Sequence, residues 1–130
     1  MQTIHIFGNP DLPFDALPVR LLSRFRKAFP QIDFRFTDPN ELDIPVAGED
    51  FIAIDTVAGL KNVREISIDE ISAGQTRATA HDYDLAAYLL LVKKINKNIG
   101  IRVIGIPMKC DEEIAFRETV KLLKLLRSSV

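Results

Sequence analysis

Short apolar runs alternate along the chain with longer stretches in which apolar residues recur every three or four positions. The short runs predict strands at residues 3–7, 32–36, 51–54, 65–69 and 101–106. The third run is apolar throughout and stops at Asp55, which is typical of a strand covered on both faces. The fourth run alternates apolar and polar residues and favours an edge strand.

The longer stretches predict three helices, at about residues 18–29, about 80–97 and from about 111 onward. Pro18 fits the first turn of the first helix, where its missing N–H is not needed. The residues expected on the buried helix faces are Leu21, Leu22, Phe25 and Phe29, then Leu85, Leu89, Val92 and Ile95, then Ala115, Thr119, Leu122, Leu123 and Leu126. Glu113 and Arg117 lie four residues apart, so we expect an ion pair on the outer face of the last helix.

Strands separated by helices indicate a largely parallel sheet with helices on both sides. We therefore predict an α/β fold, a three-layer αβα sandwich with a central, mostly parallel, twisted sheet of about five strands. The 130 residues contain no repeat and no linker, and are most simply one domain, residues 1–130. In such sheets, ligands bind beyond the carboxyl ends of the strands.

Composition narrows the classes of function. The net charge of −1 gives no field toward nucleic acid or anionic membrane, so we expect neither as a partner. No apolar run approaches the roughly 20 residues that span a bilayer. Residues 1–3 lack the features of a signal peptide, so we expect none. Cys110 is the only cysteine, which excludes an internal disulfide and favours the cytoplasm. We expect a cytoplasmic monomer.

Three ionisable residues fall at the predicted carboxyl edge of the sheet. Asp15 lies in the loop after the first strand, Asp55 ends the third strand, and His81 lies where the second helix opens. Thr79 and Asp82 have capping-box spacing, which places His81 in the first helical turn. A helix N-terminus disfavours positive charge, so His81 should be the neutral imidazole that a metal requires. Two carboxylates and an imidazole suit nickel or zinc.

Each of these residues also has a structural alternative. Asp15 could interact with the N-terminus of the first helix, and Asp55 could accept hydrogen bonds from the turn at residues 56–59. A single histidine at a helix start is more often structural than a ligand. From spacing alone, both a metal site and three separate structural roles remain open.

The remaining candidates favour structural roles. His5 lies inside the first strand and is expected to pack, and Cys110 is expected to be a buried or capping thiol. The four basic residues between positions 93 and 102 fit a solvated helix end better than a docking patch. The absence of a G-x-S-x-G elbow and of a glycine-rich phosphate loop argues against a serine hydrolase or a nucleotide enzyme.

Four segments of the chain resemble motifs of the hydrogenase maturation proteases. Gly8-Asn9 followed by Asp15 resembles the opening Gly-x-Gly-Asn loop and acidic residue, and residues 51–55 are similar to the apolar strand that ends in aspartate. Residues 79–85 resemble the Ser-x-His-x-x-x-Leu segment, and residues 104–107 resemble the strand near the family's C-terminus. In that family an acidic residue, an aspartate and a histidine bind the metal. The resemblance therefore assigns Asp15, Asp55 and His81 as metal ligands and catalytic residues.

The resemblance implies that the sandwich is phosphorylase/hydrolase-like and that the chain is a metal-dependent endopeptidase that acts in hydrogenase maturation. Its partner and substrate would be the nickel-loaded precursor of a nickel–iron hydrogenase large subunit, from which it removes a C-terminal peptide. The nickel arrives with the precursor and reports that insertion is complete, and other divalent metals could substitute for it. Whether the metal also polarises the scissile carbonyl or activates water stays open.

The chain departs from the family pattern around the substrate cleft. Ile6 replaces the first glycine of Gly-x-Gly-Asn, residues 37–39 replace the usual Gly-Gly-Thr, and Pro18 replaces a glycine. The loop after Pro107 is also short. The three ligand positions are unchanged. These departures motivate an alternative, a metal-binding accessory protein of hydrogenase assembly without peptidase activity. A third class, a plain interaction domain, predicts no binding of divalent metal.

Overall fold

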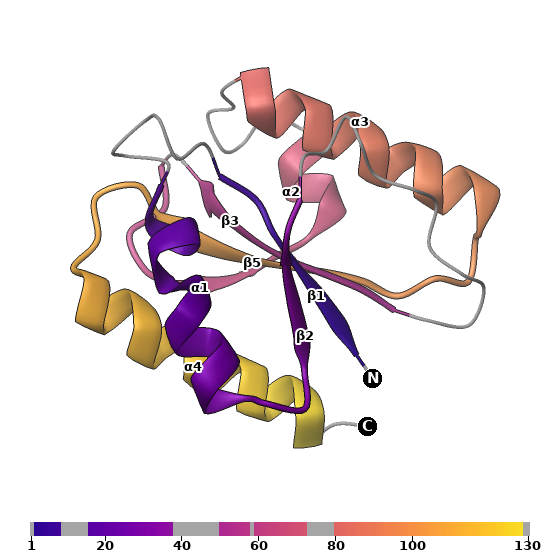
Figure 1. Cartoon of the computed structure of the whole chain (residues 1–130). Coiled ribbons are helices and arrows are strands. Elements are labelled where there is room, and N and C mark those ends of the chain that lie inside the picture. The colour runs from indigo at the N-terminus through magenta and orange to yellow at the C-terminus, as the bar shows by residue number, and fades with distance from the viewer. Residues whose placement is uncertain (1, 9–15, 38–49, 58, 73–79, 129–130) are drawn as a thin grey trace.

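A computed structural model describes residues 2–8, 16–37, 50–57, 59–72 and 80–128, with the backbone alone described at 71–72, 80–86 and 127–128. The elements in chain order are β1 (Thr3–Ile6), α1 (Leu17–Ala28), β2 (Asp33–Phe36), β3 (Phe51–Val57), β4 (Arg64–Ile66), α2 (Ile68–Ser72), α3 (Ala80–Ile95), β5 (Ile101–Pro107) and α4 (Glu112–Ser128) (Figure 1).

The described strands form one five-stranded sheet in the order β2-β1-β3-β5-β4. The pairs β1–β2, β1–β3 and β3–β5 are parallel, and β4 runs antiparallel to β5 at the edge. The predicted class, α/β with a mostly parallel sheet of five strands, is confirmed. The predicted edge strand is also present, although it is limited to residues 64–66.

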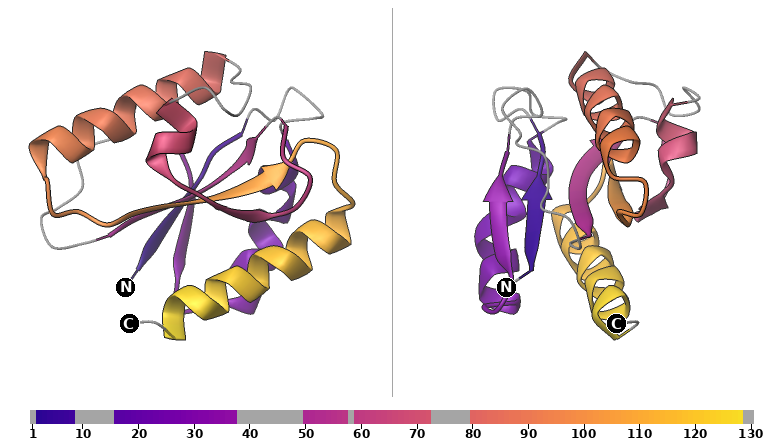
Figure 2. Two further views of the ribbon diagram at one scale, coloured as in Figure 1. Left: turned by 180° about the vertical axis from the view of Figure 1, so that it is seen from behind. Right: turned by 90° about the vertical axis from the view of Figure 1, so that its right-hand side faces the viewer.

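Helices pack on both faces of this sheet (Figure 2). On one face, isoleucines of β1, β3 and β5 contact α1 and α4; the set includes Ile4, Ile6, Ile52, Ile54, Ile104, Ile106, Leu21, Phe25, Ala115 and Leu123. On the other face, α3 covers the alternate positions; that set includes Phe51, Ala53, Val103, Tyr88, Leu89 and Val92. Burial of each large apolar side chain contributes about 1.5–3 kcal/mol, so the alternation fixes the register of these strands.

The predicted faces of the first and last helices are confirmed. Pro18 lies in the first turn of α1, as predicted. Leu21 and Phe25 are fully buried. Phe29 is buried too, but it follows the helix as its C-cap residue. In α4, Ala115, Thr119 and Leu123 are buried, while Leu122 and Leu126 pack against the same core.

The prediction for one residue of the second helix, Ile95, is wrong. Ile95 was expected on the buried face of α3, but 56% of it is exposed. The cause is that apolar residues surround most of this helix, so periodicity alone does not identify its inner side. Leu89 and Val92 are buried as predicted. The side chain of Leu85 lies outside the described residues.

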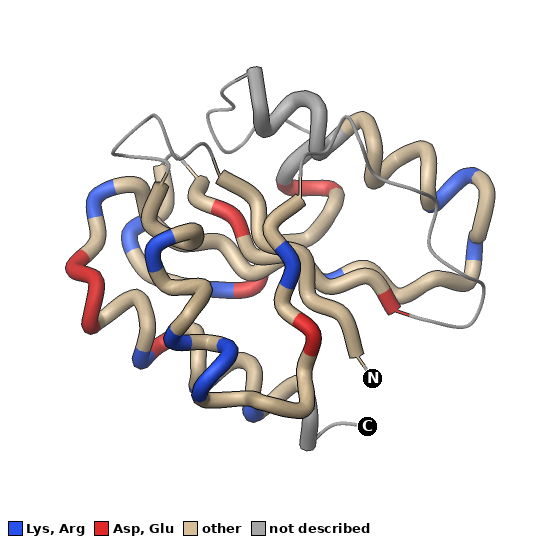
Figure 3. Tube along the Cα trace, viewed as in Figure 1, with Lys and Arg blue, Asp and Glu red and all other residues tan. Residues whose placement is uncertain are grey.

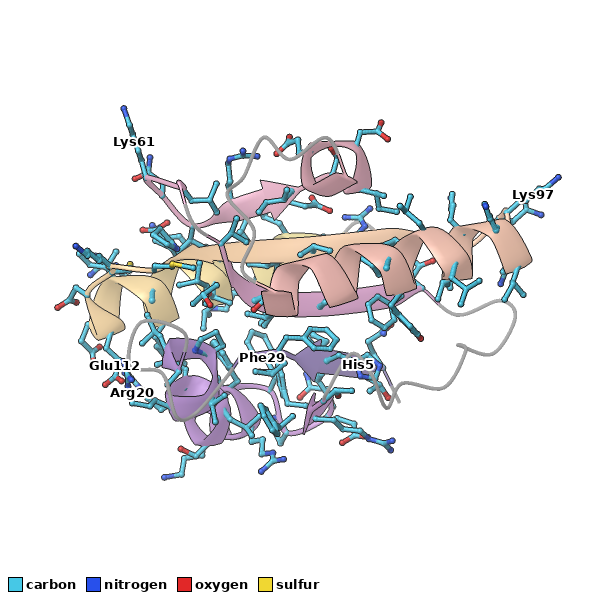
Figure 4. All side chains as sticks on the ribbon, turned by 90° about the horizontal axis from the view of Figure 1, so that it is seen from above. His5, Arg20, Phe29, Lys61, Lys97 and Glu112 are labelled. Atoms are coloured by element: carbon cyan, nitrogen blue, oxygen red, sulfur yellow. The ribbon has the colours of Figure 1, made fainter. Side chains whose placement is uncertain are left out.

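The ion pair predicted between Glu113 and Arg117 is replaced by a contact between helices. The Glu113 carboxylate accepts hydrogen bonds of 2.8 and 3.1 Å from both terminal nitrogens of Arg24 on α1. A second pair, Arg20 with Glu112 at 3.3 Å, joins the same two helices (Figure 4). Basic positions of α1 and acidic positions of α4 thus meet where these helices lie side by side (Figure 3). The rule that pairs charges four residues apart on one helix cannot predict that Glu113 pairs with Arg24 on another helix.

Candidate functional site

Asp55 lies inside β3 rather than at its end. The strand was predicted to stop at Asp55, but it continues through Thr56 to Val57. The last register pair between β1 and β3 joins Ile6 to Ile54, and the Phe7 amide donates a 2.9 Å hydrogen bond to the Ile54 carbonyl. Asp55 is therefore the first residue of β3 beyond the end of β1. On its other side it remains paired with β5.

This step in the sheet edge is also the point where the chain reverses its direction of winding. From β1 the chain crosses through α1 to β2 on one side, whereas β3 lies on the other side of β1. In open α/β sheets, the crevice at such a switch point is the usual place for a ligand. Asp55 is thus located where the fold class favours binding.

The Asp55 carboxylate is almost fully buried, with 1% exposure, and its neighbours Phe7 and Thr56 are fully buried. A carboxylate in such surroundings is retained only where hydrogen bonds or a cation compensate for the lost hydration. Ala53, two positions earlier, packs beneath α3, and side chains alternate along a strand. Asp55 accordingly lies on the α3 side of the sheet.

An apolar wall stands next to Asp55 on the β5 side. Gly105 is the register partner of Asp55. A methyl group at Gly105 would collide with Ile66 and lie 2.6 Å from Leu60 Cδ1, so these two side chains occupy the space above the glycine. Gly59, with φ of +88°, forms the turn that directs Leu60 back over β5. The pattern of apolar residues does not predict this wall, although a mid-strand glycine is a known sign of close approach.

The structure describes neither of the other two predicted ligand side chains. Asp15 lies outside the described residues. His81 is the second residue of α3. Its backbone belongs to the described part of the chain, but its side chain does not. The Tyr88 ring lies 5.8 Å from the Phe51 ring at the start of β3. From there β3 rises roughly 13 Å to Asp55 and α3 extends roughly 10 Å back to its start, on the same side of the sheet (Figure 1).

The start of α3 and the buried aspartate therefore lie toward one edge of the sheet. Among the side chains that the structure describes, no group of three or more His, Cys, Asp or Glu residues is arranged to hold a metal ion. Because two of the three expected ligands fall outside that set, the ligand and catalytic roles of Asp15, Asp55 and His81 stay predictions.

His5 is a packed residue, as predicted. Its Nδ1 lies 3.0 Å from the Thr37 hydroxyl, and its ring stacks on Phe51 with centroids 4.9 Å apart. Burial, and to a lesser degree the charge of Arg35, lowers the pKa of His5, while Asp33 opposes this shift. The ring is therefore neutral at pH 7, which suits its aromatic stacking.

Cys110 also has the structural role that was predicted. It is half-buried against the core beneath α1 and α4. Burial, followed by the nearby charge of Asp111, raises the pKa of the Cys110 thiol. Since the thiolate is the reactive form, this cysteine is a poor nucleophile.

The basic residues between positions 93 and 102 do not act as one group. Lys93 Nζ donates a 2.9 Å hydrogen bond to the Ile99 carbonyl just after α3, and Arg102 lies 3.9 Å from Glu65 on β4. Lys94 and Lys97 are exposed at the end of the helix. The three lysines agree with the predicted solvated helix end, whereas Arg102 belongs to β5 and was wrongly grouped with them.

Comparison with known proteins yields no assignment: no family model matches the chain, and no curated protein or solved structure is significantly similar to it. In the part of the chain that is described, no helix is both long and apolar enough to traverse a bilayer. The buried aspartate, its position in the sheet and the motifs around it are therefore the features that bear on function.

Proposed function

We propose that this chain is a metal-dependent endopeptidase of the hydrogenase maturation type. It removes a C-terminal peptide from the nickel-loaded precursor of a nickel–iron hydrogenase large subunit, in the cytoplasm. The observation that carries the proposal is Asp55, a carboxylate with 1% exposure at the switch point of a parallel sheet. The packing of α1 and α4 on one face and α3 on the other supports a three-layer, phosphorylase/hydrolase-like fold.

The chemistry of the donor set fits a divalent ion of borderline softness. Asp55 supplies a charged oxygen in surroundings of low polarity, where attraction to a cation is stronger than in water. Asp15 would add a second carboxylate from the loop after β1, and His81 a neutral imidazole from the first turn of α3. Two carboxylates and one imidazole leave coordination positions for groups that the precursor provides.

In this proposal nickel is part of the substrate rather than a resident cofactor. The three ligands bind the nickel ion that the precursor carries. Only a nickel-loaded precursor is therefore bound with its C-terminal segment at the site. A divalent ion can polarise the scissile carbonyl or activate a water molecule. The apolar wall formed by Leu60 and Ile66 over Gly105 would exclude water on that side of Asp55 and thus strengthen its attraction to the metal.

The direct test is cleavage of a nickel-loaded precursor, followed by the mass of the large subunit. We expect loss of the C-terminal peptide with the wild-type protein and none with a nickel-free precursor. Asp15→Asn, Asp55→Asn and His81→Ala should each abolish cleavage, and Asp50→Asn, an exposed residue at the opposite edge, should not. Cleavage at the full rate by the His81→Ala protein would refute the assignment.

Metal binding separates the protease from the two other classes. Calorimetry with nickel, or with cadmium as a surrogate, should reveal one site that each ligand substitution removes. Stoichiometric binding of the loaded precursor without loss of mass would favour the accessory protein, which the replaced cleft residues motivate. An interaction domain would bind no divalent metal either alone or with the precursor.

A further inference from the structure

β2 is an edge strand whose backbone has an open side. In the described sheet it pairs only with β1, and Figure 2 shows it at the end of the sheet. The amides of Asp33 and Thr37 donate hydrogen bonds of 2.9 Å to carbonyls on or next to β1. Backbone groups point alternately to the two sides of a strand, so the N–H and C=O groups of Phe34 and Phe36 point away from β1. Such a row of groups can pair with another extended chain.

A cation lies beside this open edge. Arg26 of α1 donates a 3.0 Å hydrogen bond from its guanidinium to the Phe34 carbonyl. Arg26 is exposed, and among the described residues no acidic side chain forms an ion pair with it. A charge at a sheet edge hinders the edges of two like molecules from pairing. Arg26 therefore protects the edge and, at the same time, offers a positive charge to a ligand that lies along it.

Apolar side chains lie one helical turn from Arg26. Leu22 is half-buried on the same side of α1, four residues earlier. Phe36 points to the same face of the sheet as Phe34, which packs beneath α1, and 47% of Phe36 is exposed. α1 and β2 run in opposite directions, because only the short turn at residues 29–32 separates them. Four helical residues and two strand residues each span roughly 6–7 Å, so Leu22 lies level with Phe36 when Arg26 lies level with Phe34.

We propose that this β2 edge surface, formed by Leu22, Arg26 and residues 34–36, binds an extended acidic segment of a partner protein by strand addition. The segment runs antiparallel to β2, the more stable pairing, and exchanges main-chain hydrogen bonds with Phe34 and Phe36. Its acidic side chain, opposite Phe34, draws the Arg26 guanidinium away from the Phe34 carbonyl, which then accepts a hydrogen bond from the segment. An apolar side chain two residues earlier contacts Leu22 and Phe36. The proposal does not depend on the proposed peptidase function.

Charge argues against a second copy of the chain as the occupant. If Phe34 pairs with Phe34 of the copy, the two Arg26 guanidiniums meet at the twofold axis. If Phe34 pairs with Phe36 of the copy, Arg35 lies opposite Arg35, and like charges directly opposite each other are unfavourable. Asp33 does not compensate, since it already pairs with Arg35 of its own strand at 2.6 Å. The carboxylate that suits Arg26 must therefore come from a different chain.

The experiment is fluorescence anisotropy of the full chain with a labelled peptide, Thr-Val-Thr-Val-Thr-Glu-Thr-Val, whose C-terminus is an amide. We expect a dissociation constant of roughly 10–100 µM. Peptides with glutamine or lysine in place of the glutamate should bind about tenfold more weakly or worse, because they lack the carboxylate that pairs with Arg26. Hydrogen exchange at the amides of Phe34 and Phe36 should slow when the glutamate peptide is bound, since both N–H groups enter the ladder.

Substitutions on both parts of the surface make the result specific. Arg26→Glu should weaken binding of the glutamate peptide about tenfold or more and make the lysine peptide the preferred ligand. Arg117→Glu, at an exposed position of α4, changes net charge equally and should leave both affinities unchanged. Phe36→Pro and Phe36→Val both remove the ring, but only proline removes the outward N–H, a loss that an edge strand tolerates. We expect proline to abolish binding and valine to keep most of it, with unaltered circular dichroism in both.

Several results would overturn the proposal. The wild type could bind none of the peptides, or bind the glutamate and lysine peptides equally. Arg26→Glu could keep the wild-type preference, or Phe36→Pro could bind as tightly as Phe36→Val. Sedimentation velocity of the concentrated wild type completes the test, and a dimer that Phe36→Pro dissociates would overturn the proposal by assigning this edge to a second copy of the chain.

Discussion

Asp55 and Gly105 are register partners on adjacent parallel strands, and the missing side chain of Gly105 is what lets Leu60 lie over β5 at this position. Leu60 comes from the turn after β3 and Ile66 from the antiparallel edge strand, so two separate segments close one side of the candidate site. A glycine in the neighbouring strand thus leaves the space that these two apolar side chains fill.

Substitution of Gly105 should therefore disturb both packing and the site. In Gly105→Ala the new methyl group displaces Ile66 and Leu60, and we expect the free energy of unfolding to fall by about 1–3 kcal/mol. Urea denaturation measures this loss. Gly100→Ala is the matched control, because the nearest atoms to its added methyl belong to the exposed carboxylate of Asp50, which can move away. Equal losses in the two proteins would contradict the packing argument.

Thr119 should be replaceable by valine with a gain in stability. Its Oγ1 is buried within α4 and has no hydrogen-bond partner among the described residues. An unsatisfied buried hydroxyl costs about 1–3 kcal/mol, and valine has nearly the same shape. We expect Thr119→Val to raise the free energy of unfolding by about 1 kcal/mol. Thr119→Ser keeps the hydroxyl and loses the methyl group, and it should destabilise the protein; a stabilising serine variant would refute this explanation.

Stability should decrease as pH falls below neutrality, in part because of His5. The folded protein holds the pKa of His5 below its usual value, so near pH 6.5 the unfolded chain binds a proton that the folded chain does not. The stabilisation is complete above the unfolded pKa and is lost as pH falls through the folded pKa. One such proton accounts for up to about 1.4 kcal/mol per pH unit.

The measurement is the free energy of unfolding in urea at pH 7.5 and at pH 5.5, for the wild type and for His5→Gln. Glutamine does not titrate, so the variant should lose less stability between the two pH values. The difference between the proteins isolates His5 from His81, the other histidine of the chain. Identical losses in the two proteins would show that the His5 environment does not favour the neutral ring.

Arg24 should matter more to stability than its partner Glu113. The guanidinium binds the Glu113 carboxylate and also lies over the Phe116 ring, 4.0 Å from its centroid. Arg24→Ala removes both contacts, whereas Glu113→Ala removes only the ion pair. We expect a larger decrease in melting temperature for Arg24→Ala, and a difference that persists in about 1 M salt, where exposed ion pairs are screened. Equal decreases at high salt would exclude a role for the ring contact.

The strands and helices could be predicted because apolar patterning is a local property. The burial of β3 on both faces and the inward residues of α1 and α4 follow directly from it. The five-residue helix α2 was not predicted, since a segment of that length contains barely one period. The partner of Glu113 and the exposure of Ile95 were also missed, because both depend on which elements become neighbours.

The candidate site, too, could be predicted only where it depends on local sequence. The apolar run at residues 51–54 predicts a strand that ends at the charged Asp55. The structure keeps it within the strand because β5 continues beside it while β1 has already ended. The relation to Gly105 and Leu60 could not be predicted, since it requires knowing that β5 lies between β3 and β4.

That strand order has a consequence for how the protein folds. In the described sheet β4 hydrogen-bonds only to β5, yet it precedes β5 in the chain, with α2 and α3 in between. The edge strand therefore reaches the rest of the sheet only through β5, and the pairing of β5 with β3 requires closing a long loop, which is the slow kind of step in folding. Ile66 belongs to that edge strand, so we expect the wall beside Asp55 to be completed late in folding, when the rest of the sheet is in place.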